Sequence, residues 1–218
     1  MQPNRNSNFI LISTLIASTF FACKHEIINS SQAALIATTE GSGSPATNTA
    51  SAHIAASEKL IIPAAVEVPA NLPGGNTRLA TFYAVGVQKY KAREKAGSYP
   101  LSYEWVFVAP QADLYDVTDA KVGTHGAGPF WQISPTDSIF AQHFSPAKTA
   151  PSPDPESIDW LLLMPKTGTT PTGIFKEAAY IQRIATKGGK APMTPPATST
   201  ETVEVKYKAV YRFTKINP

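Results

Sequence analysis

The stretch VEVKYKAVYRFT, residues 203–214, carries the clearest structural signal in this chain. Its apolar and aromatic side chains occur at every second position and alternate mainly with charged or polar ones. Successive side chains of a β-strand point to opposite faces of the sheet. The pattern therefore predicts a long strand with one face toward a core and the other toward water.

The preceding part of the chain has the same character. β-Branched and aromatic residues are concentrated in further short segments, which cover residues 78–90, 103–108, 130–133, 138–144, 160–163 and 174–185. Stretches rich in glycine and proline separate them and mark turns. We therefore predict a single-domain all-β fold, a β-sandwich or barrel of about seven to eight mainly antiparallel strands.

The amino terminus has the layout of a secretory signal peptide. Arg5 supplies a positive charge, residues 9–21 are almost wholly apolar or small, and the segment ends at Cys23, the single cysteine. It resembles the lipobox of bacterial lipoproteins, in which the cysteine is acylated and begins the mature chain. A membrane-spanning helix needs about 20 apolar residues, so a transmembrane anchor is not expected here. An ordinary signal peptide cleaved elsewhere is the alternative, because Phe20 stands where leucine is usual.

These features predict three parts of the chain. Residues 1–22 are a signal peptide, residues 23–59 are the acylated Cys23 and a disordered tether, and residues 60–218 are the folded domain. The tether is rich in small and polar residues, whereas the domain holds all three tryptophans and all eight tyrosines. We expect the acyl chains on Cys23, palmitate among them, to hold the protein to the cell membrane or the outer membrane, facing the periplasm or the exterior.

Charge and cysteine content narrow the function classes. The formal net charge of +3 is too weak to predict nucleic acid as a partner. With Cys23 acylated, no thiol remains for disulfides, thiol catalysis or a thiolate metal site. The expected partners are therefore the lipid bilayer and an unknown small molecule or envelope component.

Several blocks together resemble the DUF3455 family of secreted bacterial and fungal proteins, a domain of unknown function. The resemblance extends from about Pro63 to Phe213 and is carried by GVQKY (86–90), WVFVAPQADLYD (105–116), VGTHGAGPFW (122–131), IDWLLL (158–163), YIQR (180–183) and TKGGKAP (186–192). Members commonly carry two cysteines, one where this chain has Ala92 and one within the region of Thr194 to Thr198. The resemblance implies a disulfide that this chain has lost.

Some fungal relatives carry a malate dehydrogenase label, which this sequence does not support. The nearest approach to a dinucleotide fingerprint is GSGSPA, residues 41–46, which lies in the predicted tether. A phosphate turn for a dinucleotide requires a strand before it and a helix after it. We expect no cofactor.

His125 is the most informative titratable residue, because glycines flank it and Trp131 follows closely. Glycines let a ligand approach the backbone. His125 could act as a general base oriented by Asp137 or Asp116. Alternatively it could bond to a backbone carbonyl and hold the loop in place.

Other residues complete the candidate site. Trp131 could line a pocket or fill the core, and Gln88 and Arg183 are ligand-binding candidates whose facing the sequence leaves open. His125 and His143 have no spacing typical of metal ligands, so no metal site is predicted. The favoured function is a binding or interaction module around the loop from His125 to Trp131. The alternatives are a hydrolase-type enzyme that uses His125 with Asp137 or Asp116, and a structural envelope protein without a small-molecule ligand.

Overall fold

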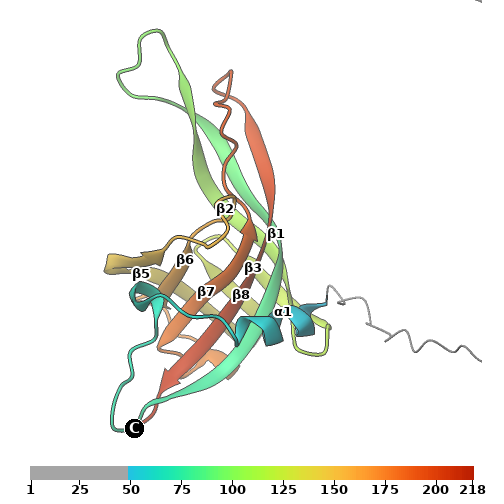
Figure 1. The fold of residues 1–218 in the computed structure, drawn as a ribbon, viewed down its shortest axis with the longest axis vertical. Helices are drawn as coiled ribbons and strands as arrows, with labels where there is room; N and C mark the ends of the chain where they lie inside the picture. The colour runs from blue at the N-terminus through green and yellow to red at the C-terminus, as the bar shows by residue number, and fades with distance from the viewer. Residues whose placement is uncertain (1–48) are drawn as a thin grey trace, which may run out of the picture. The chain divides into compact units, whose positions relative to one another are not determined.

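The structure is a computed structural model, and it describes residues 49–218. These residues form one sheet of eight antiparallel strands that closes into a barrel (Figure 1). The elements in chain order are α1 (Ala50–Ser57), η1 (Ala64–Val66), β1 (Asn76–Glu94), β2 (Tyr103–Tyr115), β3 (Lys121–Gly126), β4 (Phe130–Ser134), β5 (Asp137–Ala150), β6 (Trp160–Pro165), η2 (Gly173–Phe175), β7 (Tyr180–Gly188) and β8 (Thr202–Ile216). The predicted all-β class is confirmed, and the architecture is the barrel.

Closure of the barrel depends on the longest strand, β1. It pairs with β2 on one side and with β8 on the other, so the first and last strands of the sheet are neighbours. Strands β2 to β7 each pair with the strands before and after them in the sequence. We call the end at which β1 runs into β2 the upper end, as it is drawn in Figure 1.

The barrel interior is filled by apolar and aromatic side chains. In β8, Tyr207, Ala209, Tyr211 and Phe213 are buried in one core cluster, as the alternation of this strand predicted. The lower end is closed by η2, whose Phe175 belongs to the same cluster. The expected strand at 174–185 therefore begins later, because its first residues turn inward as a short 3-10 helix.

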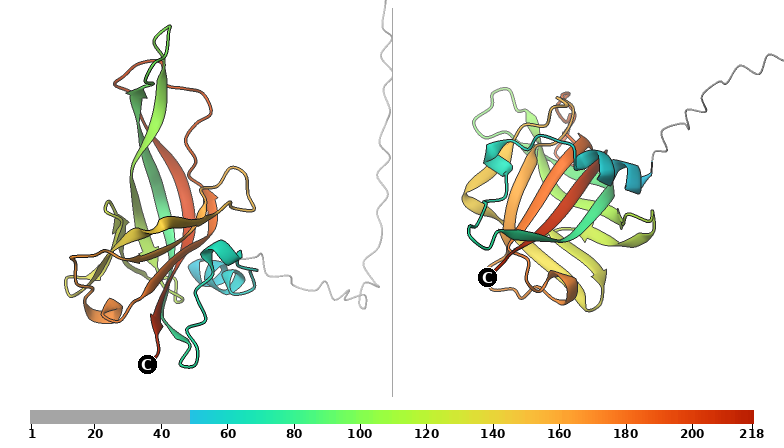
Figure 2. Two further views of the ribbon diagram at one scale, coloured as in Figure 1. Left: turned by 90° about the vertical axis from the view of Figure 1, so that its left-hand side faces the viewer. Right: turned by 60° about the horizontal axis from the view of Figure 1, so that its bottom comes forward.

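Residues 50–68 cover part of the outer barrel surface (Figure 2). Ala50, Ile54 and Val66 belong to a second apolar cluster together with the outward side chains of Tyr83, Ala150, Trp160, Leu162, Ile184 and Val210. The predicted tether is therefore wrong for residues 49–59, which belong to the folded domain. Residues 23–48 lie outside the described part of the chain.

The composition of this segment explains the error. The sequence ASAHIAAS of α1 offers only one large apolar side chain, that of Ile54, so its amphipathic character is faint. The helix is instead stabilised by contacts that depend on the barrel. His53 stacks on Tyr83 with ring centroids 4.4 Å apart, and the Ser51 amide donates to the Asp119 carboxylate at 2.9 Å.

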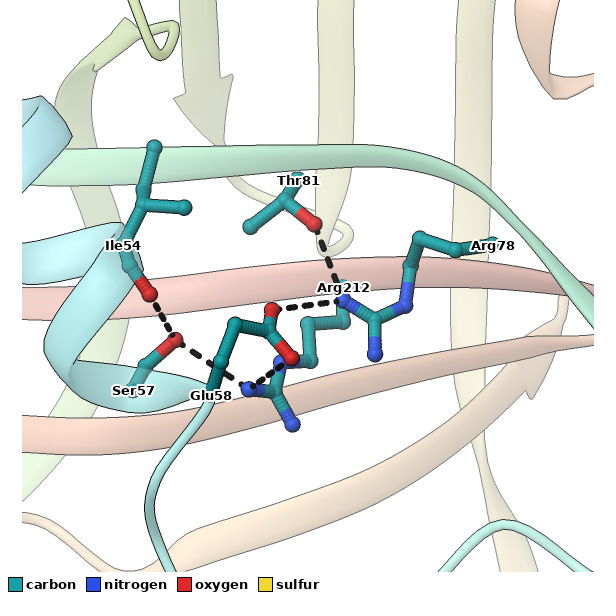
Figure 3. Close-up of polar contacts among 6 residues, drawn as sticks. All are labelled: Ile54, Ser57, Glu58, Arg78, Thr81 and Arg212. Carbon is teal, nitrogen blue, oxygen red and sulfur yellow. Dashed lines mark hydrogen bonds and ion pairs between the residues drawn. The ribbon is translucent and has the colours of Figure 1, made fainter.

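A polar network joins the end of α1 to the barrel wall (Figure 3). The Arg212 guanidinium donates to Ser57 Oγ at 3.2 Å and pairs with the Glu58 carboxylate at 3.0 Å. Arg78 pairs with the other oxygen of Glu58 at 3.1 Å, and Arg212 is only 5% exposed. Because a buried charge is costly unless it is paired, Glu58 ties the segment to strands β1 and β8.

The two regions in which the family resemblance implies a cysteine pair are neighbours here. The amide of Ala92 donates to the Glu201 carbonyl at 2.8 Å. Trp105, the β2 partner of Ala92, donates from Nε1 to the Thr194 carbonyl at 2.9 Å. The loop before β8 thus lies beside β1 without a covalent link, and the ancestral disulfide remains a prediction.

Candidate functional site

A cavity of about 330 Å³ lies at the upper end of the barrel. Most of its walls are apolar or aromatic, and His125, His143, Arg183 and Tyr211 add polar groups. Its full lining is Phe107, Val108, Ala109, Pro110, His125, Gly128, Pro129, Trp131, His143, Leu161, Leu163, Arg183 and Tyr211. The loop singled out in the sequence, from His125 to Trp131, therefore forms one wall of a cavity.

His125 lies at the end of β3 and points into the barrel. Its Nδ1 donates to the Phe130 carbonyl at 2.8 Å, across the β3–β4 turn. Its Nε2 consequently accepts from the Tyr211 hydroxyl, 3.1 Å away. The ring stacks on Trp131 with a centroid separation of 4.5 Å. Both ring nitrogens are occupied by partners, so the imidazole holds the β3–β4 turn to β8.

Burial controls the protonation of this histidine. The side chain is 3% exposed, and loss of solvent lowers the pKa of His125 to about 3. The hydrogen bond to Phe130 opposes this shift of the pKa, whereas the positive charge of Arg183 adds to it. The ring is therefore neutral at physiological pH.

The two aspartates expected to orient His125 lie at the lower end of the barrel, away from this histidine. The Asp116 carboxylate accepts from the Thr118 amide at 2.8 Å in the β2–β3 turn. The Asp137 carboxylate accepts from Ser134 Oγ and from the Ile174 amide, the latter at 2.8 Å, at the lower end. Both lie in turns at the end of the strands opposite the β3–β4 turn. The predicted pairing of His125 with either carboxylate is wrong.

Local contacts explain the low pKa values of these two carboxyl groups. The hydrogen bonds from Thr118 lower the pKa of Asp116, and those from Ser134 and Ile174 lower the pKa of Asp137. Asp137 also occupies the space that a side chain at position 173 would need, since a Cβ on Gly173 would lie 1.8 Å from its carboxylate. These aspartates stabilise turns.

Trp131 packs in the barrel core and also lines the first cavity. It is fully buried, and its ring meets those of Tyr211 and Phe213 edge-on at 5.1 and 5.5 Å. Trp160, in contrast, lies in the outer cluster beneath residues 50–68. The two tryptophans thus belong to opposite faces of the same sheet.

A second cavity, of about 350 Å³, adjoins the first. The two share Phe107, His143, Leu161 and Arg183, and the second adds Gln88, Tyr90, Ile158, Asp159 and Lys190. All four ligand-binding candidates from the sequence therefore lie around connected space. The sequence did not decide on which face of the sheet Gln88 and Arg183 lie. In the structure both side chains point into the barrel mouth.

Sequence reasoning missed Tyr211, which supplies the hydroxyl that bonds to His125. The alternation of β8 places Tyr211 on the inner face, but only the register across the closed barrel brings it to His125. Leu161 was missed for the same reason, His143 was considered only as a metal ligand, and Lys190 lies in the loop after β7. Within residues 49–218 no group of three or more histidine, cysteine, aspartate or glutamate side chains is arranged to hold a metal ion.

Comparison with known proteins gives one match. Residues 73–215 match the model of a family described as "Protein of unknown function (DUF3455)", in agreement with the resemblance found in the sequence. No curated protein and no solved structure matches the chain. Among the described helices, none is long and apolar enough to cross a membrane.

Proposed function

This chain belongs to DUF3455, a family of proteins of unknown function, and we propose that it binds a small ligand in the connected cavities at the upper end of its barrel. The observation that carries the proposal is the contrast between the two ends. Phe175 closes the lower end, whereas the upper end opens into space lined by aromatic, aliphatic and a few polar groups.

This arrangement is typical of ligand-binding barrels. An eight-stranded barrel has an interior just wide enough for side chains or one small ligand. Small-molecule sites are commonly apolar cavities of roughly 300–1,000 Å³ with a few placed polar groups, and the mouth of a barrel is a frequent location. His125 supports the site indirectly, because its bonds to Phe130 and Tyr211 fix the wall that carries Trp131.

A hydrolase built on His125 receives less support. A general base needs a free nitrogen near its substrate, and the two nitrogens of His125 already have partners. Neither Asp116 nor Asp137 contacts the ring. Binding without catalysis is the function that this geometry favours.

The binding proposal can be tested with N-phenylnaphthylamine, an uncharged aromatic probe whose fluorescence rises in apolar surroundings. We expect a fragment that spans the compact unit Gly43 to Pro218 to bind this probe at one site. Leu161→Trp should weaken binding about tenfold or more, because the larger ring fills space shared by both cavities.

Ile174→Trp is the matched control, since Ile174 is 44% exposed on η2 at the lower end. It should bind the probe as the wild type does. Direct titration with excitation of the probe measures both variants. Absence of binding to the wild type, or equal affinity in Leu161→Trp, would show that the cavities are not a ligand site.

We also propose that acylated Cys23 anchors the protein to a membrane. Support comes from the sequence: the apolar run before Cys23 ends at the single cysteine of the chain. In cells that express the full chain, Cys23→Ser is expected to abolish incorporation of labelled palmitate and to move the protein out of the membrane fraction. Unchanged labelling of this variant would rule out Cys23 as the acylated residue.

A further inference from the structure

Arg183 carries an uncompensated positive charge at the barrel mouth. Its Nε and Nη2 donate to the backbone carbonyl of Asp159 at 3.1 and 2.8 Å, which fixes the guanidinium beside both cavities. No carboxylate within residues 49–218 forms an ion pair with it. Arg212, which is buried whereas Arg183 is only partly buried, has Glu58 as its counter-ion. Arg183 therefore has no counter-ion among the described residues, and an anion in the cavities would supply one.

Gln88 provides a second and independent indication. It is 2% exposed and lines the second cavity, yet its side-chain Nε2 has no hydrogen-bond partner among the described residues. A buried donor without an acceptor costs free energy that a ligand oxygen could recover. Gln88 packs closely against Gly189, since a Cβ at that position would lie 3.1 Å from its Cγ.

The other charged residues around the two cavities leave the net charge of the barrel mouth positive. Lys190 also lines the second cavity, and its ammonium donates to the Pro155 carbonyl. Asp159 is the one carboxylate in the lining of either cavity, and its side chain forms no ion pair in the described structure. With two cations and one anion, the mouth retains a net positive charge.

The rest of the lining is apolar. Phe107, Trp131 and Leu161 present rings and an aliphatic side chain to the same space. We propose that the ligand is a small organic acid with an apolar, ring-sized body: its carboxylate accepts from Arg183 and Gln88, and its body lies against these three side chains. This inference rests on the proposed binding function and adds the chemical class of the ligand.

The test uses two competitors with the same ring and different head groups. Naphthylacetate carries a carboxylate and naphthylethanol a hydroxyl, and each is used to displace N-phenylnaphthylamine from the unit Gly43 to Pro218. We expect the acid to compete at least about tenfold better than the alcohol, because hydrogen bonds between charged groups are the strong ones. In Arg183→Gln this preference should disappear, whereas the alcohol should compete as before.

Lys206→Gln is the control for charge, since it removes one cation from an exposed position of β8. It should keep the preference for the acid. Gln88→Met separates binding from folding: we expect an unchanged or higher melting temperature, because an unpaired buried donor is removed, together with a several-fold weaker affinity for the acid.

The outcomes separate the two proposals. If the probe does not bind, the binding function itself fails. If the probe binds but acid and alcohol compete equally in the wild type, the binding function stands and the assignment of an acidic ligand is overturned. A preference for the acid that survives in Arg183→Gln would likewise overturn the role of Arg183.

Discussion

Acidification from pH 6.5 toward pH 3 is expected to remove about 5 kcal/mol of folding stability through His125 alone. The unfolded chain protonates this histidine near its ordinary pKa of 6.5, whereas burial lowers the pKa in the folded barrel to about 3. Between these values the unfolded state binds more protons. The stability contribution is therefore complete above pH 6.5 and falls by about 1.4 kcal/mol per pH unit below it.

Urea denaturation at a series of pH values measures this slope. In His125→Asn the slope between pH 6.5 and 4 should be much shallower, although the variant is less stable at neutral pH because the Tyr211 contact is lost. His53→Asn is the control, since His53 lies on the outer face and stacks on Tyr83. Burial lowers the pKa of His53 as well, so this variant reports the share of the slope that comes from the second histidine.

The carboxyl groups act in a lower range of pH. Hydrogen bonds lower the pKa of Asp116, Asp137 and Asp154 below the ordinary value of 3.8, so their contributions to stability are lost progressively as the pH falls below about 5. Above about pH 5 the slope is therefore set mainly by the histidines. An unchanged slope in His125→Asn would contradict the buried, neutral state of this ring.

Ile54→Ala is expected to lower the free energy of unfolding by about 2–4 kcal/mol, although Ile54 lies in a segment with the composition of a linker. The side chain is 6% exposed and packs beneath α1 in the outer cluster. Removing it leaves a cavity between α1 and the barrel wall. Urea denaturation of the unit from Gly43 to Pro218 at neutral pH measures the loss.

Ile61→Ala is the matched control, because Ile61 is 92% exposed a few residues further along the same segment. It should change the stability by no more than about 0.5 kcal/mol. If both variants were as stable as the wild type, residues 50–57 would not be part of the folded domain. A loss confined to Ile54→Ala would place the amino-terminal boundary of the domain before α1.

Local patterns in the sequence predicted seven of the eight strands and missed β3 (Lys121–Gly126), and the reason for the success is physical. A strand such as β8 shows its two faces directly, because neighbouring side chains point in opposite directions. The glycine and proline clusters likewise marked most of the turns. Antiparallel order follows from the short connections between most of the strands. The fold class was therefore within reach of the sequence.

The candidate site could be predicted from the sequence only in part. The glycines around His125 identified its loop as unusual. Trp131, Gln88 and Arg183, named with it as ligand-binding candidates, line the two cavities, and their part in binding a ligand stays a prediction. The carboxylate partner of His125 was predicted wrongly. Asp137 and Asp116 are near His125 in the sequence, but each lies one strand length away, at the lower end. Sequence distance is a poor guide when a strand carries the chain from one end of a barrel to the other.

Alternation and composition were thus enough to establish an all-β domain and most of its strands, and the glycines around His125 marked the loop of interest. Closure of the sheet decided the rest, because pairing of β1 with β8 sets which inward side chains meet. That closure brings Tyr211 to His125 and places Arg183 and Gln88 beside shared space. It also creates the outer apolar surface that recruits α1, whose own sequence is too weakly amphipathic to signal a helix.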